Sequence, residues 1–181
     1  MSNIKTEINA TRAIVLETER LVLRRLCADD ADFIIELLNQ PSFLRYIGDK
    51  GVRNAADAVE YIQSGPVASY ERFGFGLYLV QLKDSEVPVG MCGLLKRDSL
   101  PDVDVGFAFL PSYWSQGFAF EAAMAVVNYG REAFGLKRIV AITSLDNAAS
   151  IKLLERMGFH FEGLISLGED QAQVRLFASA S

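Results

Sequence analysis

The stretch VDVGFAFLPSYWSQGFAFEAAM, residues Val103 to Met124, decides the fold of this chain. Its first part alternates large apolar residues with small or polar ones, which is the period of a half-buried strand: Val103, Val105, Phe107 and Phe109. Pro111 ends the strand, because proline has no N–H to give to a ladder. A turn around Gly117 follows, and from Phe118 an Ala-rich run has helical spacing. The stretch therefore predicts a strand, a glycine turn and a helix.

The glycine turn is a candidate phosphate site. A helix that begins after glycine exposes backbone N–H groups without partners, and such groups attract anions. Many α/β proteins use the same turn for packing alone, so both interpretations stand at this point. Two known phosphate loops are excluded. No GxxxxGK[ST] occurs, and the pair Gly74 and Gly76 lacks the third glycine of a dinucleotide fingerprint, where Leu79 stands and a strand follows.

Composition limits the classes of function. Of the 181 residues half are hydrophobic, which is enough for the buried core of one domain. The formal net charge of −5 argues against a nucleic-acid footprint, although a local basic patch stays open. Because His160 is the only histidine and no CxxC occurs, we expect no metal site. The cysteines Cys27 and Cys92 are far apart in the chain, and we expect both to be reduced and buried.

The sequence shows no targeting or membrane segment. No apolar run approaches the about 20 residues that a membrane span needs, and MSNIKTEINATR at residues 1–12 has no signal-peptide core. We therefore expect a cytoplasmic protein without a membrane partner. Residues 1–17 are polar and aperiodic apart from Ile14, Val15 and Leu16. They predict a loose N-terminal arm with a short strand at its end, ahead of one domain over residues 18–178.

Periodicity places the elements of this domain. Apolar runs predict further strands at 20–26, 75–82, 87–96, 138–143, 159–167 and 173–178. Helical spacing predicts helices at 31–40, 54–65, 67–74, 118–134 and 147–158. We expect Pro41 to end the first of these, and Ser64, Gly65 and Pro66 to interrupt the second. In the strand at 87–96, Gly90 and Gly93 indicate a bulge or close packing.

The connections between these elements predict the topology. Short polar turns make the strands between residues 75 and 109 antiparallel, whereas the crossover through the helix at 118–134 adds a parallel pair. The fold class is therefore α/β. We expect one domain with a mixed, mostly antiparallel central sheet, a β-α-β crossover and flanking helices.

Three segments carry a family resemblance: TERLVLRRL at 18–26, GFAFLPSYWSQGFAFEA at 106–122, and NAASIKLLERMGFHFEG at 147–163. In these segments the sequence resembles the GCN5-related N-acetyltransferase (GNAT) family, and within it the RimJ/RimL-type ribosomal-protein alanine N-acetyltransferases. The resemblance extends from about Thr18 to Ala178. It implies a GNAT-like fold with acetyl-CoA as co-substrate and no metal.

The resemblance also implies where acetyl-CoA binds. The family loop that cradles the pyrophosphate corresponds here to Trp114, Ser115, Gln116, Gly117, Phe118 and Ala119. Trp114 replaces the usual Arg or Gln, and Phe120 stands where this branch usually has Thr. The pantetheine arm pairs in the family with the strand before the loop, which carries a bulge and splays the sheet. That strand corresponds here to Phe107, Ala108, Phe109 and Leu110.

The family also has an asparagine that contacts pantetheine, and Asn147 matches it. A plain helix cap is the alternative role for Asn147, and the two roles are compatible because they use different groups. Where much of the family has a catalytic tyrosine, this sequence has Leu154. Ser150 is then the available hydroxyl, and we expect it to give a hydrogen bond to the leaving sulfur. Its alternative role is to help Asn147 cap the helix.

Attack of a neutral amine on the acetyl thioester also needs an oxyanion donor and a proton acceptor. We expect the donor to be a backbone N–H near Phe109 or Leu110. No residue stands out as the general base, which a water relay or direct binding of the neutral amine would explain. Alternation places Asp104 on the same face of the strand as Gly106 and Ala108, and exposure of this face to solvent would explain an aspartate there without a catalytic role. The other candidates are Asp98, Asp102, Glu60 and Glu71.

The sequence as a whole predicts an N-acetyltransferase that moves an acetyl group from acetyl-CoA to a primary amine by direct attack in a ternary complex. A protein N-terminus is the first expectation for the acceptor. A small-molecule amine, such as a polyamine, an amino acid or an antibiotic, is the alternative. The absent tyrosine and the unassigned base leave open a non-catalytic acyl-CoA-binding sensor, and a loop used only for packing would leave a structural domain. Monomer and homodimer both stay open.

Overall fold

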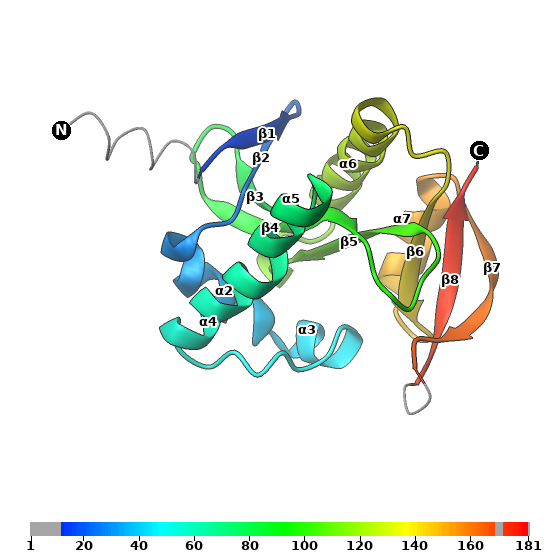
Figure 1. Ribbon diagram of the computed structural model, residues 1–181, viewed down its shortest axis with the longest axis horizontal. Coiled ribbons are helices and arrows are strands. Elements are labelled where there is room, and N and C mark those ends of the chain that lie inside the picture. The colour runs from blue at the N-terminus through cyan, green and yellow to red at the C-terminus, as the bar shows by residue number, and fades with distance from the viewer. Residues whose placement is uncertain (1–11, 169–171, 181) are drawn as a thin grey trace.

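Eight strands form one sheet in the computed structural model, which describes residues 12–168 and 172–180 (Figure 1). In chain order they are β1 (Ile14–Glu17), β2 (Leu21–Arg24), β3 (Leu77–Leu82), β4 (Pro88–Leu95), β5 (Val103–Phe109), β6 (Ile139–Ser144), β7 (Phe159–Ser166) and β8 (Gln173–Ser179). Across the sheet their order is β1-β2-β3-β4-β5-β6-β8-β7, and only the β5–β6 pair is parallel. The predicted fold class is confirmed.

Helices cover both faces of this sheet. They are η1 (Ala28–Asp30), α2 (Ala31–Leu38), α3 (Pro41–Tyr46), α4 (Ala55–Ile62), η2 (Gln63–Val67), α5 (Ala68–Phe73), η3 (Pro111–Tyr113), α6 (Phe118–Phe134) and α7 (Ala148–Arg156). Tyr78 and Val80 of β3 belong to the core that α6 and α7 cover, whereas Leu79 belongs to the core under α2, α3 and α4. Consecutive strand residues point to opposite faces, so the two cores lie on either side of the sheet. Figure 1 shows α6 in its upper half and α2, α3 and α4 in its lower half.

The predicted N-terminal arm differs from the structure at its end. Residues 1–11 lie outside the described part of the chain. Ile14–Glu17 is the expected short strand, but it pairs with β2 and is therefore an edge strand of the sheet. The short strand predicted at the end of the arm is thus part of the sheet.

Two prolines act differently from the prediction. Pro41 ends α2 as expected, but it also begins α3, because its fixed φ angle suits the first position of a helix. The predicted interruption is present, since α4 ends at Ile62 before Ser64, Gly65 and Pro66, but Pro66 does not stop the chain from continuing as a helix. It lies in η2, a π-helical turn of five residues, where the Ala68 N–H donates to the Gln63 carbonyl. This wider turn accommodates a residue that has no N–H, so α4 and α5 continue one another.

The glycines of β4 serve both of the predicted purposes. The register with β3 shifts between the pairs Val80–Gly90 and Gln81–Pro88, so a bulge adjoins Gly90. At Gly93 a Cβ would lie 1.9 Å from the Gly76 carbonyl oxygen, so the backbones pack too closely for any side chain. β4 therefore approaches the start of β3 closely at Gly93, where only glycine fits.

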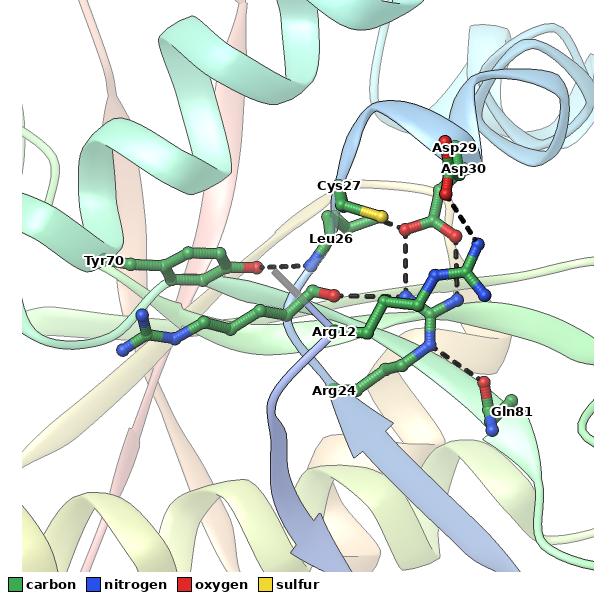
Figure 2. A network of polar contacts seen from close by, with 9 residues as sticks. Arg12, Arg24, Leu26, Cys27, Asp29, Asp30, Tyr70 and Gln81 are labelled. Atoms are coloured by element: carbon green, nitrogen blue, oxygen red, sulfur yellow. Dashed lines mark hydrogen bonds and ion pairs between the residues drawn. The ribbon is translucent and has the colours of Figure 1, made fainter. Parts of the chain in front are cut away.

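A buried polar network fastens the start of the helical layer to the sheet (Figure 2). Two guanidinium nitrogens of Arg24 in β2 donate to the Asp30 carboxylate at 2.7 and 2.9 Å, while Nε donates to Gln81 of β3 at 3.0 Å. The Tyr70 hydroxyl of α5 accepts from the Leu26 N–H at 3.2 Å and donates to the Leu77 carbonyl. The network thus holds η1 and α5 against the β2–β3 pair.

The two remaining sequence predictions about the chain concern thiols and membranes. Cys27 and Cys92 are both free and buried, as predicted. Burial raises the pKa of the Cys92 thiol, so this side chain is no nucleophile. None of the helices in residues 12–168 and 172–180 has the length and apolar character that crossing a bilayer requires.

The β5–β6 pair opens after its first residues. Val103 pairs with Ile139 and Asp104 with Val140, and no later residue of β5 pairs with β6. On its other side β5 pairs with β4 from Asp104 to Phe109 without a shift. The expected bulge is therefore absent from this ladder, and the sheet splays because the two parallel strands diverge.

Candidate active site

The second half of β5 presents an unpaired backbone edge. The Leu110 N–H donates to the Val89 carbonyl at 2.9 Å, so Leu110 faces β4. Since strand residues alternate between their two neighbours, the N–H and C=O groups of Phe107 and Phe109 face the opening toward β6. The indole N–H of Trp114 donates a hydrogen bond of 2.9 Å to the Phe109 carbonyl, so this carbonyl already has a partner. Of the two predicted oxyanion donors, the Leu110 N–H is therefore excluded, whereas the Phe109 N–H has no acceptor among the described residues.

The loop after β5 folds into a compact turn. Leu110 leads into η3, and the Gln116 side chain donates to the Ser112 carbonyl at 3.1 Å. Ser115 has φ 60° and Gly117 has φ 84°, so the backbone twice enters the left-handed region. Gly117 is the N-cap of α6, and its carbonyl accepts the first helical hydrogen bond, from Glu121.

The start of α6 fits a phosphate group. Within the described residues, none accepts a hydrogen bond from the backbone N–H groups of residues 115–120. These groups lie at the positive end of a helix of 17 residues, where an anion is favoured. A Cβ at Gly117 would lie 3.2 Å from an Arg20 nitrogen, so glycine keeps the mouth of the loop clear. Trp114, Ser115 and Gln116 are exposed there.

The side chains of Asn147 and Ser150 lie at the start of α7, just after β6. Asn147 is the N-cap, and its Oδ1 accepts from the Ser150 N–H at 3.2 Å. The cap uses the backbone of Ser150 and leaves its hydroxyl, and also the Asn147 Nδ2, without a partner among the described residues. Ser144 at the end of β6 has a buried hydroxyl that also lacks a partner there. Three polar groups are thus available where β6 diverges from β5.

A family model described as the acetyltransferase (GNAT) domain matches residues 20–160 of this chain. The chain belongs to the GNAT family. The Bacillus subtilis (strain 168) protein YoaA, an uncharacterized N-acetyltransferase, is 32% identical over 152 residues, which are 83% of this chain and 85% of that protein. The enzyme class predicted from the sequence, an acetyl-CoA-dependent N-acetyltransferase, is therefore confirmed.

Solved GNAT structures share the fold. A GNAT-family acetyltransferase from Bacillus anthracis has a TM-score of 0.74 and 25% identity, over 91% of this chain and 97% of that one. RimL, a ribosomal L7/L12 alpha-N-protein acetyltransferase, has a TM-score of 0.73 and 17% identity in its complex with coenzyme A, over 93% of this chain and 98% of that one. The predicted RimL-like resemblance is thus matched at the level of the fold.

The candidate bases of this GNAT chain are either paired with an arginine or exposed. Asp104 was expected in solvent, but it is 1% exposed, and both of its oxygens accept from Arg97 Nε, at 3.0 and 3.2 Å. Burial raises the pKa of Asp104, although Arg97 opposes the shift. Asp102 pairs with Arg138 at 3.0 Å. The other three, which are Asp98, Glu60 and Glu71, are exposed.

Sequence reasoning missed a second polar cluster of the GNAT loop. The Glu121 carboxylate in the first turn of α6 accepts from the Thr18 hydroxyl at 2.6 Å, from the Arg20 N–H at 2.8 Å and from Arg20 Nε at 2.7 Å. The signal was present in the segment TERLVLRRL, which contributes to the family resemblance. Nothing in its spacing shows that Thr18 and Arg20 meet α6, because the contact joins residues about a hundred positions apart.

Proposed function

We propose that this GNAT enzyme binds acetyl-CoA with its pyrophosphate on the N–H groups of residues 115–120 and its pantetheine arm along the open edge of β5. One observation carries the proposal. The edge at Phe107 and at the Phe109 N–H, which β6 does not pair, leads directly into a loop whose N–H groups have no partner among the described residues. An extended arm adds to such an edge as a further strand would, and its phosphates end at a helix N-terminus.

The proposal assigns roles to the groups beside the opening. Asn147 Nδ2 donates to the pantetheine arm while Oδ1 stays in the helix cap. Acetyl-CoA, when bound, supplies the thioester that the amine attacks. The Phe109 N–H then stabilises the developing oxyanion, and the Ser150 hydroxyl gives a hydrogen bond to the departing sulfur. Leu154, which replaces the family's tyrosine, is 1% exposed and belongs to the core, so it offers no substitute.

The general base is left to a water relay or to direct binding of the neutral amine. Asp104 is engaged with Arg97 and reaches no solvent, so it is a poor proton acceptor for an incoming ammonium. A relay through water would place the titrating group away from the open edge. The pH dependence of kcat/KM distinguishes the two routes, since only the relay adds a second ionisation to that of the acceptor.

For the acceptor we propose a primary amine, with a protein N-terminus first. The fold neighbour RimL is named as an alpha-N-protein acetyltransferase. A hollow of about 350 Å³ adjoins the end of β5, lined in part by Leu110, Tyr113, Asp32 and Glu36. Its two carboxylates suit an ammonium group, which is the dominant form of an amine at neutral pH.

A small-molecule amine is the second candidate. A hollow of about 300 Å³ between α4–α5 and the β3–β4 pair is lined in part by Tyr61, Arg72 and Lys96. This volume is in the range of small-ligand pockets, roughly 300–1,000 Å³. Its two cationic side chains favour an amine that also carries an anionic group, such as an amino acid.

Coenzyme A binding tests the site. Calorimetry would compare the wild type with Gly117→Asp and Gly117→Asn, which differ in charge but hardly in size. We expect binding to weaken in both, and more in the aspartate variant, because the carboxylate repels the pyrophosphate. Gly135→Asp is the control, because Gly135 is also left-handed, at φ 64°, but lies at the other end of α6 with open space around it. Full coenzyme A affinity in Gly117→Asp would leave the loop a packing feature.

Turnover then tests the acceptor and the sensor alternative. Thiol release from acetyl-CoA would be followed with peptides that have free N-termini, the same peptides blocked by acetylation, spermidine, amino acids and an aminoglycoside. Turnover of free peptides alone supports a protein N-terminus, whereas turnover of a small amine alone supports the second candidate. Coenzyme A binding without turnover on any of these amines would contradict the transferase mechanism and favour a sensor.

A further inference from the structure

The phosphate loop of this chain carries no positive charge of its own. Between Arg97 and Arg131 the sequence contains no lysine or arginine, and the loop position that is usually Arg or Gln in the family is Trp114. The first turn of α6 instead carries Glu121, whose carboxylate lies 18% exposed. An acid at this position stabilises the helix dipole but repels a bound pyrophosphate. A cation from elsewhere in the fold would offset this repulsion.

Arg20 comes from the connection between β1 and β2 and packs against the loop. Its guanidinium Nε donates to Glu121 at 2.7 Å, and Nη1 donates to the Gln116 carbonyl at 2.9 Å. The guanidinium carbon lies 4.5 Å from the centre of the Phe118 ring. Its Nη2 has no acceptor among the described residues, and this is the nitrogen that a Cβ at Gly117 would approach to 3.2 Å. The side chain is 43% exposed and so is accessible to a ligand.

The bond to Gln116 orients the loop. In a trans peptide the C=O and the following N–H point in opposite directions. Because Arg20 holds the Gln116 carbonyl on its own side, the Gly117 N–H points away from Arg20. Thr18 adds to the arrangement, since its hydroxyl and the Arg20 backbone N–H both donate to the other Glu121 oxygen, at 2.6 and 2.8 Å. These bonds hold the pKa of Glu121 below its ordinary value in spite of burial, so the carboxylate stays charged and paired.

We infer that Arg20 is a positioning residue of the acyl-CoA site. It neutralises Glu121, and by holding the Gln116 carbonyl it directs the Gly117 N–H to the opposite side, where that N–H meets the pyrophosphate. The inference rests on the proposed binding of acetyl-CoA at this loop. Arg156 of α7 is a second guanidinium near the helix start, 4.2 Å from the centre of the Phe120 ring, but it contacts no loop carbonyl among the described residues.

Binding of two ligands tests the inference. Coenzyme A would be titrated by calorimetry into the wild type, Arg20→Ala and Arg20→Lys, and pantetheine, which is the same arm without phosphates, by NMR. We expect Arg20→Ala to raise the Kd for coenzyme A about ten-fold or more, because it leaves the Glu121 carboxylate unpaired near the pyrophosphate and releases the Gln116–Gly117 peptide. Arg20→Lys keeps the charge but lacks the planar guanidinium that contacts Glu121 and the Gln116 carbonyl together, so its affinity for coenzyme A should be intermediate. The Kd for pantetheine should stay within about two-fold of the wild type in both variants.

A double variant tests the role of charge. Glu121→Gln in the Arg20→Ala background removes the repulsion that Arg20 no longer neutralises, and we expect it to restore part of the coenzyme A affinity. Arg131→Ala is the matched control, since Arg131 also donates to a backbone carbonyl, that of Ala180, but at the far end of α6. Its coenzyme A affinity should equal that of the wild type.

The outcomes separate this inference from the proposed function. If the folded wild type binds no coenzyme A, the proposed site itself fails. If the wild type binds and Arg20→Ala binds equally well, only the role of Arg20 fails. Equal weakening of coenzyme A and pantetheine, or no recovery in the double variant, would also overturn it, because a merely structural defect does not distinguish ligands by their phosphates.

Discussion

The amide of Asn147 has two ends with separate tasks. Oδ1 accepts from the Ser150 N–H and caps α7, while Nδ2 has no partner among the described residues and is assigned to pantetheine in our proposal. An N-cap contributes about 1 kcal/mol to stability, and aspartate caps as well as asparagine does. The two tasks are therefore separable by substitution.

Asn147→Asp should keep the cap and lose the donor. We expect its melting temperature to stay at or above that of the wild type, because an acid also suits the helix N-terminus, while coenzyme A binding weakens. Asn147→Ala should lose both, with a fall of about 1 kcal/mol in the free energy of unfolding. Calorimetry and thermal melting on the same samples would check this. Unchanged binding in Asn147→Asp would leave Asn147 as a cap alone.

Ser150 makes a similarly local prediction. Its hydroxyl takes no part in the cap, so Ser150→Ala should leave the melting temperature unchanged and lower kcat about ten-fold or more, with a smaller change in the KM for acetyl-CoA. Steady-state kinetics with the amine found active would measure this. A kcat equal to that of the wild type would exclude the hydroxyl from the chemistry.

At the scale of elements, β4 shows how closely the central strands approach one another. Gly93 lies opposite Leu77 on one side and Gly106 on the other. A Cβ added there would meet two backbone groups, the Gly76 oxygen at 1.9 Å and the Leu77 Cα at 2.7 Å. Neither atom moves unless a whole strand moves, so the position admits glycine only.

Gly93→Ala should therefore destabilise the sheet by about 2 kcal/mol or more, since overpacking a rigid backbone costs typically 1–3 kcal/mol. Chemical denaturation would measure the loss. Gly65→Ala in η2 is the control, because no atom lies within 4 Å of its added Cβ and its φ is not left-handed. We expect Gly65→Ala to change stability little, and equal losses in the two variants would contradict the packing argument.

The elements were predicted correctly where the periodicity of neighbouring residues decides the structure. They were predicted less well at prolines, where the backbone continued as a helix. The strand, glycine turn and helix around Gly117 were predicted with nearly the right bounds, because alternation and helical spacing are properties of neighbouring residues. The interruption of the α-helix at Ser64, Gly65 and Pro66 was predicted, whereas the π-helical turn that joins α4 to α5 there was not, because its geometry depends on more than these three residues. The helix at Pro41 was missed for the same reason, since proline both ends one helix and begins another.

At the scale of the whole molecule, the Arg24–Asp30 pair joins the helical layer to the sheet. Burial alone would raise the pKa of Asp30, but hydrogen bonds from Arg24 and from the Cys27 N–H hold it below the ordinary value of 3.8. A lowered pKa in the folded state contributes stability above pH 3.8, and this contribution is lost as the pH falls through the folded value. Protonation of Asp30 at low pH should therefore lower the free energy of unfolding.

We expect the free energy of unfolding to fall as the pH drops below about 4, and Asp30→Asn to flatten part of this slope. At neutral pH the same variant should cost about 3 kcal/mol or more, because it leaves the Arg24 charge buried without its partner. Urea denaturation at several pH values would measure both. Asp49→Asn is the control, since its pair with Arg53 is exposed on both sides, and an equal cost there would refute the role of burial.

The sequence by itself determined the fold class, the family resemblance, the strand and glycine loop that we propose for acetyl-CoA, and the cap at Asn147, because each depends on residues close together in the chain. Only the tertiary structure decided which groups are free. The Leu110 N–H donates to Val89, whereas the Phe109 N–H has no acceptor among the described residues. Asp104 is buried beside Arg97, and Arg20 pairs with Glu121, which is 101 positions away in the chain. Such pairings depend on how strands align in the sheet. Strand alignment follows from burial of the whole core, which no local pattern contains.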